Sequence, residues 1–249
     1  MLFQKNKLKK LEERKTNIKK NVLLLTAHPD DETMFFLPLV KYLLKENYNL
    51  HVLCLTFGQL QNDISSSKRK AEFEKVMNNL NIKKYEILNL EKEGLYDSNK
   101  TQWDNKITNK YCTEYINKQK INVVFSFDQY GVSGHNNHIA LYNFLHAFKQ
   151  NTENKNNEII KLYVLESVNI LRKYFIPVDI TVLLMKEFIN VLYLSILGKE
   201  LFDSFIFLNF EFFSSWKLMA IYKSQFLWFR KLWVIFSRYN YINTFKRLI

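Results

Sequence analysis

The feature that most constrains the fold is an alternation of short apolar runs, rich in β-forming residues, with longer amphipathic patterns. The apolar runs predict strands at Asn21–Thr26, His51–Thr56, Tyr85–Leu90, Asn122–Phe127 and Leu162–Glu166. The intervening patterns predict helices at Phe36–Glu46, Lys68–Leu80 and Lys106–Lys118. Strands that alternate with helices in this way are typical of parallel sheets. We therefore expect an α/β fold with a Rossmann-like, doubly wound, mainly parallel sheet.

In such sheets, ligands bind in the loops that follow the carboxyl ends of the strands. The predicted strands place these loops at residues 27–33, 57–65, 91–104 and 128–138. A functional site is therefore expected where these four loops meet.

The chain has 249 residues, of which 47% are hydrophobic, and this is enough for one well-buried core. We expect a basic N-terminal tail at 1–20, with seven Lys, one Arg and two Glu, followed by a single domain at 21–249. The polar stretch Gln150–Glu158 is interpreted as a disordered insertion. The two cysteines, Cys54 and Cys112, have no CxxC spacing, which indicates a reducing compartment.

Basic and aromatic residues are concentrated at residues 212–249, which hold seven Lys or Arg, twelve aromatic residues and no acid. This composition suits a phosphate-rich surface, and we expect C-terminal helices at a membrane interface. The helical pattern from Phe226 to Arg238 places apolar residues on one side and basic residues on the other. The alternative is a core helix whose basic edge faces water. The candidates for contact with a lipid phosphate are Arg172, Lys173, Arg230 and Arg238.

Val178 to Leu197 is the best candidate for a transmembrane segment. Lys186 and Glu187 lie at its middle, where charges are costly in hydrocarbon. We therefore interpret this stretch as a buried or interfacial helix, and the protein as membrane-associated and not membrane-spanning.

The first predicted strand runs into Ala27-His28-Pro29-Asp30-Asp31-Glu32, which crowds one imidazole and three carboxylates into five positions. Such crowding of acids is unfavourable without a cation. His28 and Asp31 lie on either side of a proline-fixed turn and can aim at one point, which suits zinc or a similar divalent ion. Asp30 would then be free to act as a base.

The fourth predicted strand leads into Gly131-Val132-Ser133-Gly134-His135-Asn136-Asn137-His138. The glycines permit a tight loop, and His135 and His138 fall on one face of the helix that follows. Each histidine alone is more often a surface or core residue than a ligand. Three ligands, His28, Asp31 and His138, would leave an open coordination position, which is typical of a hydrolytic site. We expect a divalent metal cofactor, with Zn²⁺ as the default.

The segments AHPDDE at 27–32 and GVSGHNNHIAL at 131–141 resemble the PIG-L/LmbE family of N-acetylglucosaminyl deacetylases. The resemblance implies His28, Asp31 and His138 as metal ligands and Asp30 as the general base. It also implies that His135 stabilises the tetrahedral intermediate or protonates the amine. The family's R-x-x-E element and its D…WD segment correspond to Arg69 and Asp97, which, with Arg172, are the predicted substrate contacts. Tyr222 departs from the family pattern, which often has His there.

The blocks at 167–174, 224–230 and 236–239 look like the branch of the family that serves GPI-anchor synthesis. This likeness implies that the acetyl group is removed from N-acetylglucosaminyl-phosphatidylinositol at the cytoplasmic face of the endoplasmic reticulum membrane. The alternatives are a deacetylase of soluble GlcNAc conjugates and, from another class, a nucleic-acid-binding protein suggested by the pI of about 9.4. The latter leaves both His/Asp clusters unexplained, so we expect a glycolipid partner and no nucleic acid.

Overall fold

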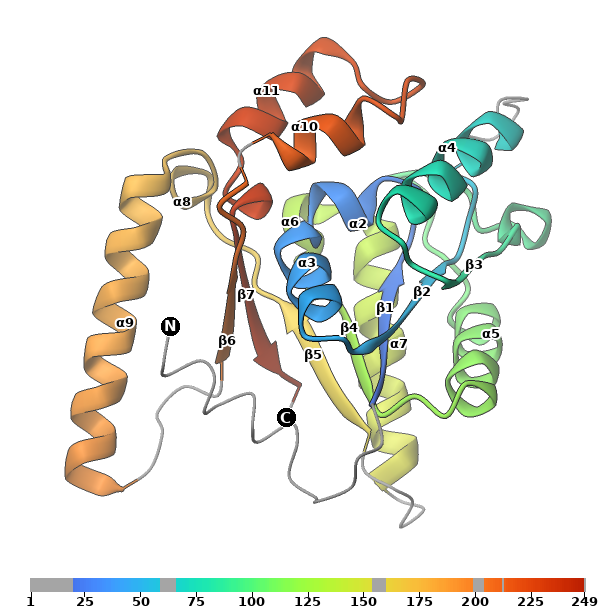
Figure 1. Cartoon of the computed structure of the whole chain (residues 1–249). Helices are drawn as coiled ribbons and strands as arrows, with labels where there is room; N and C mark the ends of the chain where they lie inside the picture. Colours follow the sequence, from blue (N-terminus) through green and yellow to red (C-terminus); the bar gives the residue numbers. More distant parts are fainter. Residues whose placement is uncertain (1–19, 59–65, 154–159, 199–203, 212, 249) are drawn as a thin grey trace.

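The computed structural model describes residues 20–58, 66–153, 160–198, 204–211 and 213–248. Within them, one seven-stranded sheet has the order β3-β2-β1-β4-β5-β7-β6 (Figure 1). The strands are β1 Asn21–Thr26, β2 Asn49–Cys54, β3 Lys84–Ile87, β4 Val123–Phe127, β5 Lys161–Leu165, β6 Ser204–Leu208 and β7 Ile242–Arg247. The first five strands in this order are parallel, and β7 and β6 pair antiparallel at one edge. The predicted α/β fold with a mainly parallel sheet is confirmed.

Helices cover both faces of the sheet, with α3 in front of it and α7 behind it in Figure 1. The longer helices are α3 Leu37–Lys45, α4 Ser66–Asn79, α5 Asn105–Lys118, α7 Asn136–Glu153, α9 Ile176–Leu197 and α11 Trp228–Phe236. The short ones are α2 Asp31–Met34, α6 Gly131–Gly134, α8 Ile170–Tyr174 and α10 Ser214–Met219, with 3₁₀ turns η1 Leu90–Glu93 and η2 Arg238–Asn240.

The two central strands are buried because helices cover them on both sides. Five of the six residues of β1 and all five residues of β4 are buried, so neither strand needs a polar face. Their register pairs Val22 with Val123 and Leu24 with Phe125. The chain turns outward from β1 to β2 and β3 on one side, and from β4 to β5 on the other. The carboxyl ends of β1 and β4 therefore flank the topological switch point, where ligands of such sheets bind.

Strand boundaries differ from the sequence prediction by a few residues. The predicted His51–Thr56 is β2 at Asn49–Cys54, because Cys54 pairs with Thr26, the last residue of β1. Residues 55 and 56 still donate backbone hydrogen bonds to Thr26 and Ala27 past this pair. The predicted Tyr85–Leu90 ends at Ile87, since Leu90 begins a 3₁₀ turn. In the predicted insertion Gln150–Glu158, residues up to Glu153 continue α7, so the expected disorder is wrong there. Residues 154–158 and nearly all of the 1–20 tail lie outside the described residues.

The C-terminal stretch 212–249 is not helical throughout. Helices α10 and α11 bear out the first part, but Ile242–Arg247 forms β7, an internal strand between β5 and β6. The first four residues of β7 are buried, and Phe245 packs against Phe125 and Phe207 in the core. The one aromatic residue of this strand therefore serves the core of the domain.

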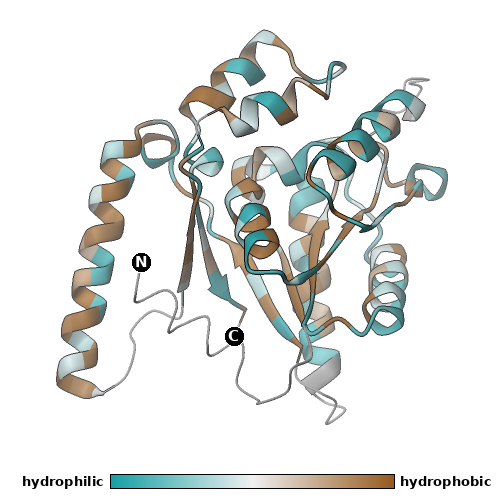
Figure 2. Ribbon diagram, in the orientation of Figure 1, coloured by the Kyte–Doolittle hydropathy of each residue, from teal (hydrophilic) through white to brown (hydrophobic). Residues whose placement is uncertain are grey.

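Helix α9 is long and apolar but is not part of the core. It has the length and composition of a membrane-crossing helix, with only 6% of its most apolar 18-residue stretch buried. The buried alternative predicted for Val178 to Leu197 is therefore wrong. Asp179, Leu183 and Asn190 form its buried inner stripe. Most of its exposed side chains are apolar, and the helix stands at the outer edge of the molecule (Figure 2).

Candidate metal and catalytic site

The loop after β1 is organised by one carboxylate. Oδ2 of Asp31 accepts hydrogen bonds from the backbone N–H groups of Ala27, at 3.0 Å, and His28, at 2.9 Å. Its other oxygen, Oδ1, lies 3.2 Å from Nε2 of His138. Burial opposes ionisation of Asp31, but the His138 imidazole beside it lowers the pKa of the carboxyl to about 2. Asp31 is therefore a fixed negative charge at the end of β1.

The loop after β4 is held in an uncommon conformation. Gly131 and Gly134 have φ values of 54° and 75°, so the tight loop predicted from the glycines is confirmed. Val132 also has a positive φ, of 65°, which is costly for a β-branched residue. Its N–H donates to Ser167 Oγ at 2.8 Å, and its carbonyl accepts from Lys173 Nζ at 2.8 Å. These two contacts fix the loop that carries both histidines.

His138 presents an unused nitrogen to Asp31. Its Nδ1 lies 3.1 Å from the Gly131 carbonyl, which assigns the proton to Nδ1 and the lone pair to Nε2. The ring stacks on Phe127, with centroids 3.8 Å apart, so it cannot turn freely. Nε2 is buried and has no hydrogen-bond partner among the described residues. A lone pair that faces a carboxylate in a buried site calls for a positive charge there, which either a proton or a metal ion can supply.

The pKa of His138 also indicates that a positive charge is favoured beside Asp31. Burial opposes the charged imidazolium, yet the Asp31 carboxylate raises the pKa of His138 above its usual value. A proton can therefore occupy the position in which a metal ion would satisfy both groups. The residues present fit a divalent cation.

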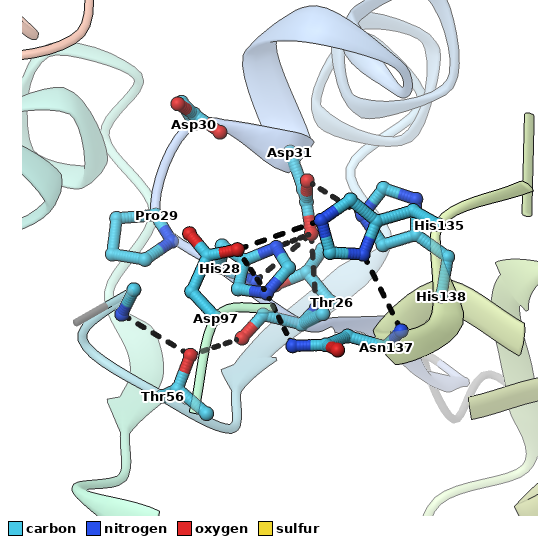
Figure 3. A network of polar contacts seen from close by, with 12 residues as sticks. Thr26, His28, Pro29, Asp30, Asp31, Thr56, Asp97, His135, Asn137 and His138 are labelled. Atoms are coloured by element: carbon cyan, nitrogen blue, oxygen red, sulfur yellow. Dashed lines mark hydrogen bonds and ion pairs between the residues drawn. The ribbon is translucent and has the colours of Figure 1, made fainter. Parts of the chain in front are cut away.

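Figure 3 shows that His28, Asp31, Asp97, His135 and His138 converge on one place. Two overlapping groups have ligand atoms within 4.8 Å of one another: the buried group His28, Asp31 and His138, and the more exposed group His28, Asp97 and His135. The first is the set predicted from the sequence. The structure thus brings together two chain segments that are over a hundred residues apart.

Asp97 contacts two of the three histidines, His28 and His135. Its Oδ1 lies 3.4 Å from Nε2 of His28 and 3.5 Å from Nε2 of His135. Burial works the other way, but His28 and His135 hold the pKa of Asp97 below its usual range. By contrast, burial lowers the pKa of His28 to about 4, which leaves its imidazole neutral and able to ligate. Asp97, predicted as a substrate contact, is therefore also placed to orient the histidines.

Asp30 lies beside the cluster but does not join it. In Figure 3 its side chain points away from the histidines, and no hydrogen bond or ion pair joins it to the residues drawn. Its Oδ2 forms an ion pair with Arg230 from α11 and lies 3.7 Å from Arg69. Burial raises the pKa of Asp30, although both guanidinium groups oppose this. A role as a base requires the carboxylate to turn toward the cluster.

Arg69 forms part of the wall of the site. Its guanidinium donates to Asp97 Oδ2 at 3.1 Å, to the Pro29 carbonyl at 3.1 Å and to the Gly58 carbonyl. The group is buried, so Arg69 positions Asp97 and the 27–32 loop. Its predicted contact with substrate is not tested by these interactions.

Two predicted phosphate contacts lie outside the cluster. Arg172 and Arg238 both pair with the buried Asp179 at the start of α9, at 2.8 Å and 2.7 Å. Arg238 is fully buried and lies beyond the end of α11, so its predicted place on the exposed basic side of that helix is wrong. The pair with Asp179 explains why it is inside. Arg172, half-buried, stays a prediction as a substrate contact.

Sequence reasoning missed two long-range contacts at the site. Tyr222 Oη donates to Oε1 of the buried Glu32 at 2.7 Å, and Arg230 holds Asp30. Burial raises the pKa of Glu32 to about 7, although the hydrogen bond from Tyr222 opposes this. The only sequence signal for the first contact is that Tyr222 stands where the family pattern often has His. Arg230 had been noted only as one of four candidate phosphate contacts.

Sequence comparison with known proteins gives a family match over the part of the chain that carries the cluster. The family described as PIG-L: GlcNAc-PI de-N-acetylase matches residues 23–149, just over half of the chain. A probable N-acetylglucosaminyl-phosphatidylinositol de-N-acetylase of Dictyostelium discoideum is 31% identical, over 96% of this chain and 98% of its own length. The N-acetylglucosaminyl-phosphatidylinositol de-N-acetylase of Bos taurus is 32% identical, over 89% of this chain and 81% of its own length.

Among solved structures, the N,N'-diacetylchitobiose deacetylase of Pyrococcus horikoshii superposes with a TM-score of 0.57 at 19% identity, covering 99% of this chain and 91% of its own. This likeness concerns the fold. The family match and the near full-length relatives show that the chain belongs to the PIG-L/LmbE family of deacetylases.

Proposed function

We propose that the protein is a zinc-dependent amide hydrolase that removes the acetyl group from N-acetylglucosaminyl-phosphatidylinositol. The single observation that carries the metal-dependent part is the buried Nε2 of His138. In the part of the chain that the structure describes, it has no hydrogen-bond partner, and it faces Asp31 Oδ1 at 3.2 Å. The substrate is supported by the names of relatives that are about 31% identical over most of the chain.

His28, Asp31 and His138 would hold the ion. When bound, a zinc ion supplies a Lewis acid and lowers the pKa of water to about 7. Asp97 holds His28 and His135 in place, and the buried Arg69 holds Asp97. The more exposed group, His28, Asp97 and His135, is the alternative ligand set.

Two residues would move protons. Asp30 takes a proton from the attacking water, after its carboxylate turns from Arg230 toward the cluster. His135 stabilises the tetrahedral intermediate or protonates the leaving amine, so that acetate and a free glucosamine amine are released. Arg69, Asp97 and Arg172 remain the proposed substrate contacts.

A membrane surface is the proposed location, on the cytoplasmic face of the endoplasmic reticulum. Exposed apolar side chains on α9 and α11, among them Phe188 at 71% and Trp228 at 73%, support it. The inner stripe of α9 is anchored to the body by Asp179 and by Lys186, which lies 3.0 Å from Glu166. A helix with one side on the protein and the other side apolar suits the plane of the interface better than a full crossing.

The function is tested by incubating purified protein with N-acetylglucosaminyl-phosphatidylinositol in mixed micelles and measuring acetate release. We expect release that stops with a chelator and returns with added zinc. Release from soluble GlcNAc-inositol at the same rate would favour a deacetylase of soluble conjugates. No release from either substrate by the metal-loaded protein would refute the proposal.

A further inference from the structure

A pocket of about 680 Å³ lies next to the candidate site, bordered by α2, α8 and α11. Phe35, Phe229, Leu232, Trp233 and Phe236 make its wall largely apolar. It shares residues with the surroundings of the site: the ring of Phe35 packs edge-on against His138, with centroids 5.5 Å apart. A ligand in this pocket would therefore end close to the metal ligands.

Arg230 is the one cationic side chain among the described residues that line this pocket. It is largely buried and pairs with Asp30, and this pairing holds the guanidinium at the boundary between the pocket and the candidate site. A guanidinium offers five N–H donors, so one carboxylate does not exhaust it. An anionic group can therefore bind beside Asp30 or replace it, and phosphate is the anion that matches this fork best.

The pocket also leads to apolar surface. Phe229, Leu232 and Phe236 line it and are about half exposed, and on the same helix Trp228 and Ile235 are exposed beside them. A single cation with this much apolar wall does not suit a free sugar, which needs several polar partners, or a nucleic acid, which needs many cations. It suits an anionic headgroup attached to a hydrocarbon chain.

We propose that this pocket is a phospholipid subsite, in which Arg230 binds the phosphodiester and the aromatic wall takes the first part of an acyl chain. The inference rests on the proposed function and makes Arg230 the residue that selects lipid-linked over soluble substrates. It also gives a direction: the sugar lies toward the histidines and the chain toward the exposed side of α11.

Binding of dioctanoyl-phosphatidylinositol, kept below its micelle concentration, tests this subsite by calorimetry without any catalytic turnover. We expect Arg230→Gln to weaken binding about ten-fold or more, because a charge-assisted contact to phosphate is lost. Lys231→Gln, at the next position of α11, is the matched control and is expected to bind as the wild type does. Equal binding by the Arg230→Gln protein would overturn the proposal.

Further ligands separate the phosphate from the chain. Glycerophosphoinositol and inorganic phosphate are expected to bind much more weakly than the dioctanoyl lipid, and dioctanoylglycerol is expected to be insensitive to Arg230→Gln. Should inorganic phosphate bind as tightly as the lipid, the site would be an anion site only and the proposal would fail. Leu232→Trp, which fills the pocket but keeps Arg230, is a second variant and is expected to exclude the lipid.

The outcome is separable from that of the proposed function. Arg230-dependent lipid binding by a protein that releases no acetate would keep the subsite and remove the deacetylase assignment. If the protein released acetate from N-acetylglucosaminyl-phosphatidylinositol but lipid binding did not change with Arg230→Gln or Leu232→Trp, the deacetylase assignment would stand and the subsite would be rejected.

Discussion

The cluster at the switch point differs from the exposed apolar faces of α9 and α11, two separate helices that are together called the arm. The two regions depart from ordinary burial in opposite directions. The cluster buries His28, Asp31 and His138, whereas the arm exposes residues such as Phe188 and Trp228. Buried polar groups and large exposed apolar patches are the informative exceptions to hydrophobic burial. The first kind calls for a cation and the second for a nonpolar surface. The described residues supply neither partner.

The two regions are also joined. Arg230 reaches from α11 to Asp30, and Tyr222 reaches from the segment before α11 to Glu32. The α11 part of the arm is therefore in direct contact with the loop that carries two of the proposed metal ligands. The comparison predicts that substitutions in the cluster affect metal and chemistry, while substitutions in the arm affect access of lipid substrate.

The largest effect is expected from His138→Ala. Loss of one of three ligands should remove bound metal and lower deacetylation at least about a thousand-fold. Metal content by mass spectrometry and acetate release measure the two effects together. His146→Ala is the matched control, since His146 is exposed on the same helix. Retained metal with normal turnover in the His138→Ala protein would break the assignment of the cluster.

A smaller but distinct effect is expected from Asp30→Ala. The residue lies outside the ligand cluster, so metal should stay bound while turnover falls roughly a hundred- to a thousand-fold. The same two measurements separate a base from a ligand. Full activity would refute the role of Asp30, and loss of metal would mean that it is a ligand.

The arm is tested by Phe188→Glu combined with Leu192→Glu on the exposed side of α9. Two charges in an apolar contact surface should weaken binding to phosphatidylinositol-containing vesicles about ten-fold or more in a flotation assay. Hydrolysis of a monomeric short-chain substrate should not change. Asn78→Glu with Asn79→Glu adds the same charge to exposed positions of α4, on the far side of the molecule in Figure 1. If this control lost vesicle binding equally, the effect would come from the added net charge and not from the apolar surface of α9.

The last effect is on stability and is expected from Tyr222→Phe, which removes the hydrogen bond to Glu32. The free energy of unfolding should fall by about 1.5–3 kcal/mol where the carboxyl is charged. This hydrogen bond favours the ionised form, and the pKa of Glu32 is about 7. The loss should therefore be small near pH 5, where the carboxyl is protonated, and grow as pH rises through about 7. Urea unfolding at several pH values measures it, and a loss independent of pH would contradict this account.

The parts of the fold that the sequence predicted are those governed by local pattern. The first strand, Asn21–Thr26, has the predicted boundaries because a fully buried parallel strand is a continuous apolar run. Convergence of the two histidine segments also followed, since strand order places the ends of β1 and β4 side by side.

The missed parts depend on distant contacts. Strand β7 lies in a stretch whose aromatic and basic composition resembles an interfacial helix, and only its pairing with β5 and β6 makes it a strand. The pairs Arg230 with Asp30 and Tyr222 with Glu32 join residues 200 and 190 positions apart. No periodicity encodes such pairs. The burial of Arg238 likewise depends on Asp179, which lies on another helix.

The proposed function depends most on a single cation shared by the loops after β1 and β4. Anomalous diffraction at the zinc edge from a zinc-loaded crystal tests this most directly. We predict one peak per chain, bounded by His28 and His138 on two sides and by Asp31 on the third. A peak held by Asp97 and His135 with His28 would move the site to the other ligand group, and the absence of any peak between the two loops would contradict the account.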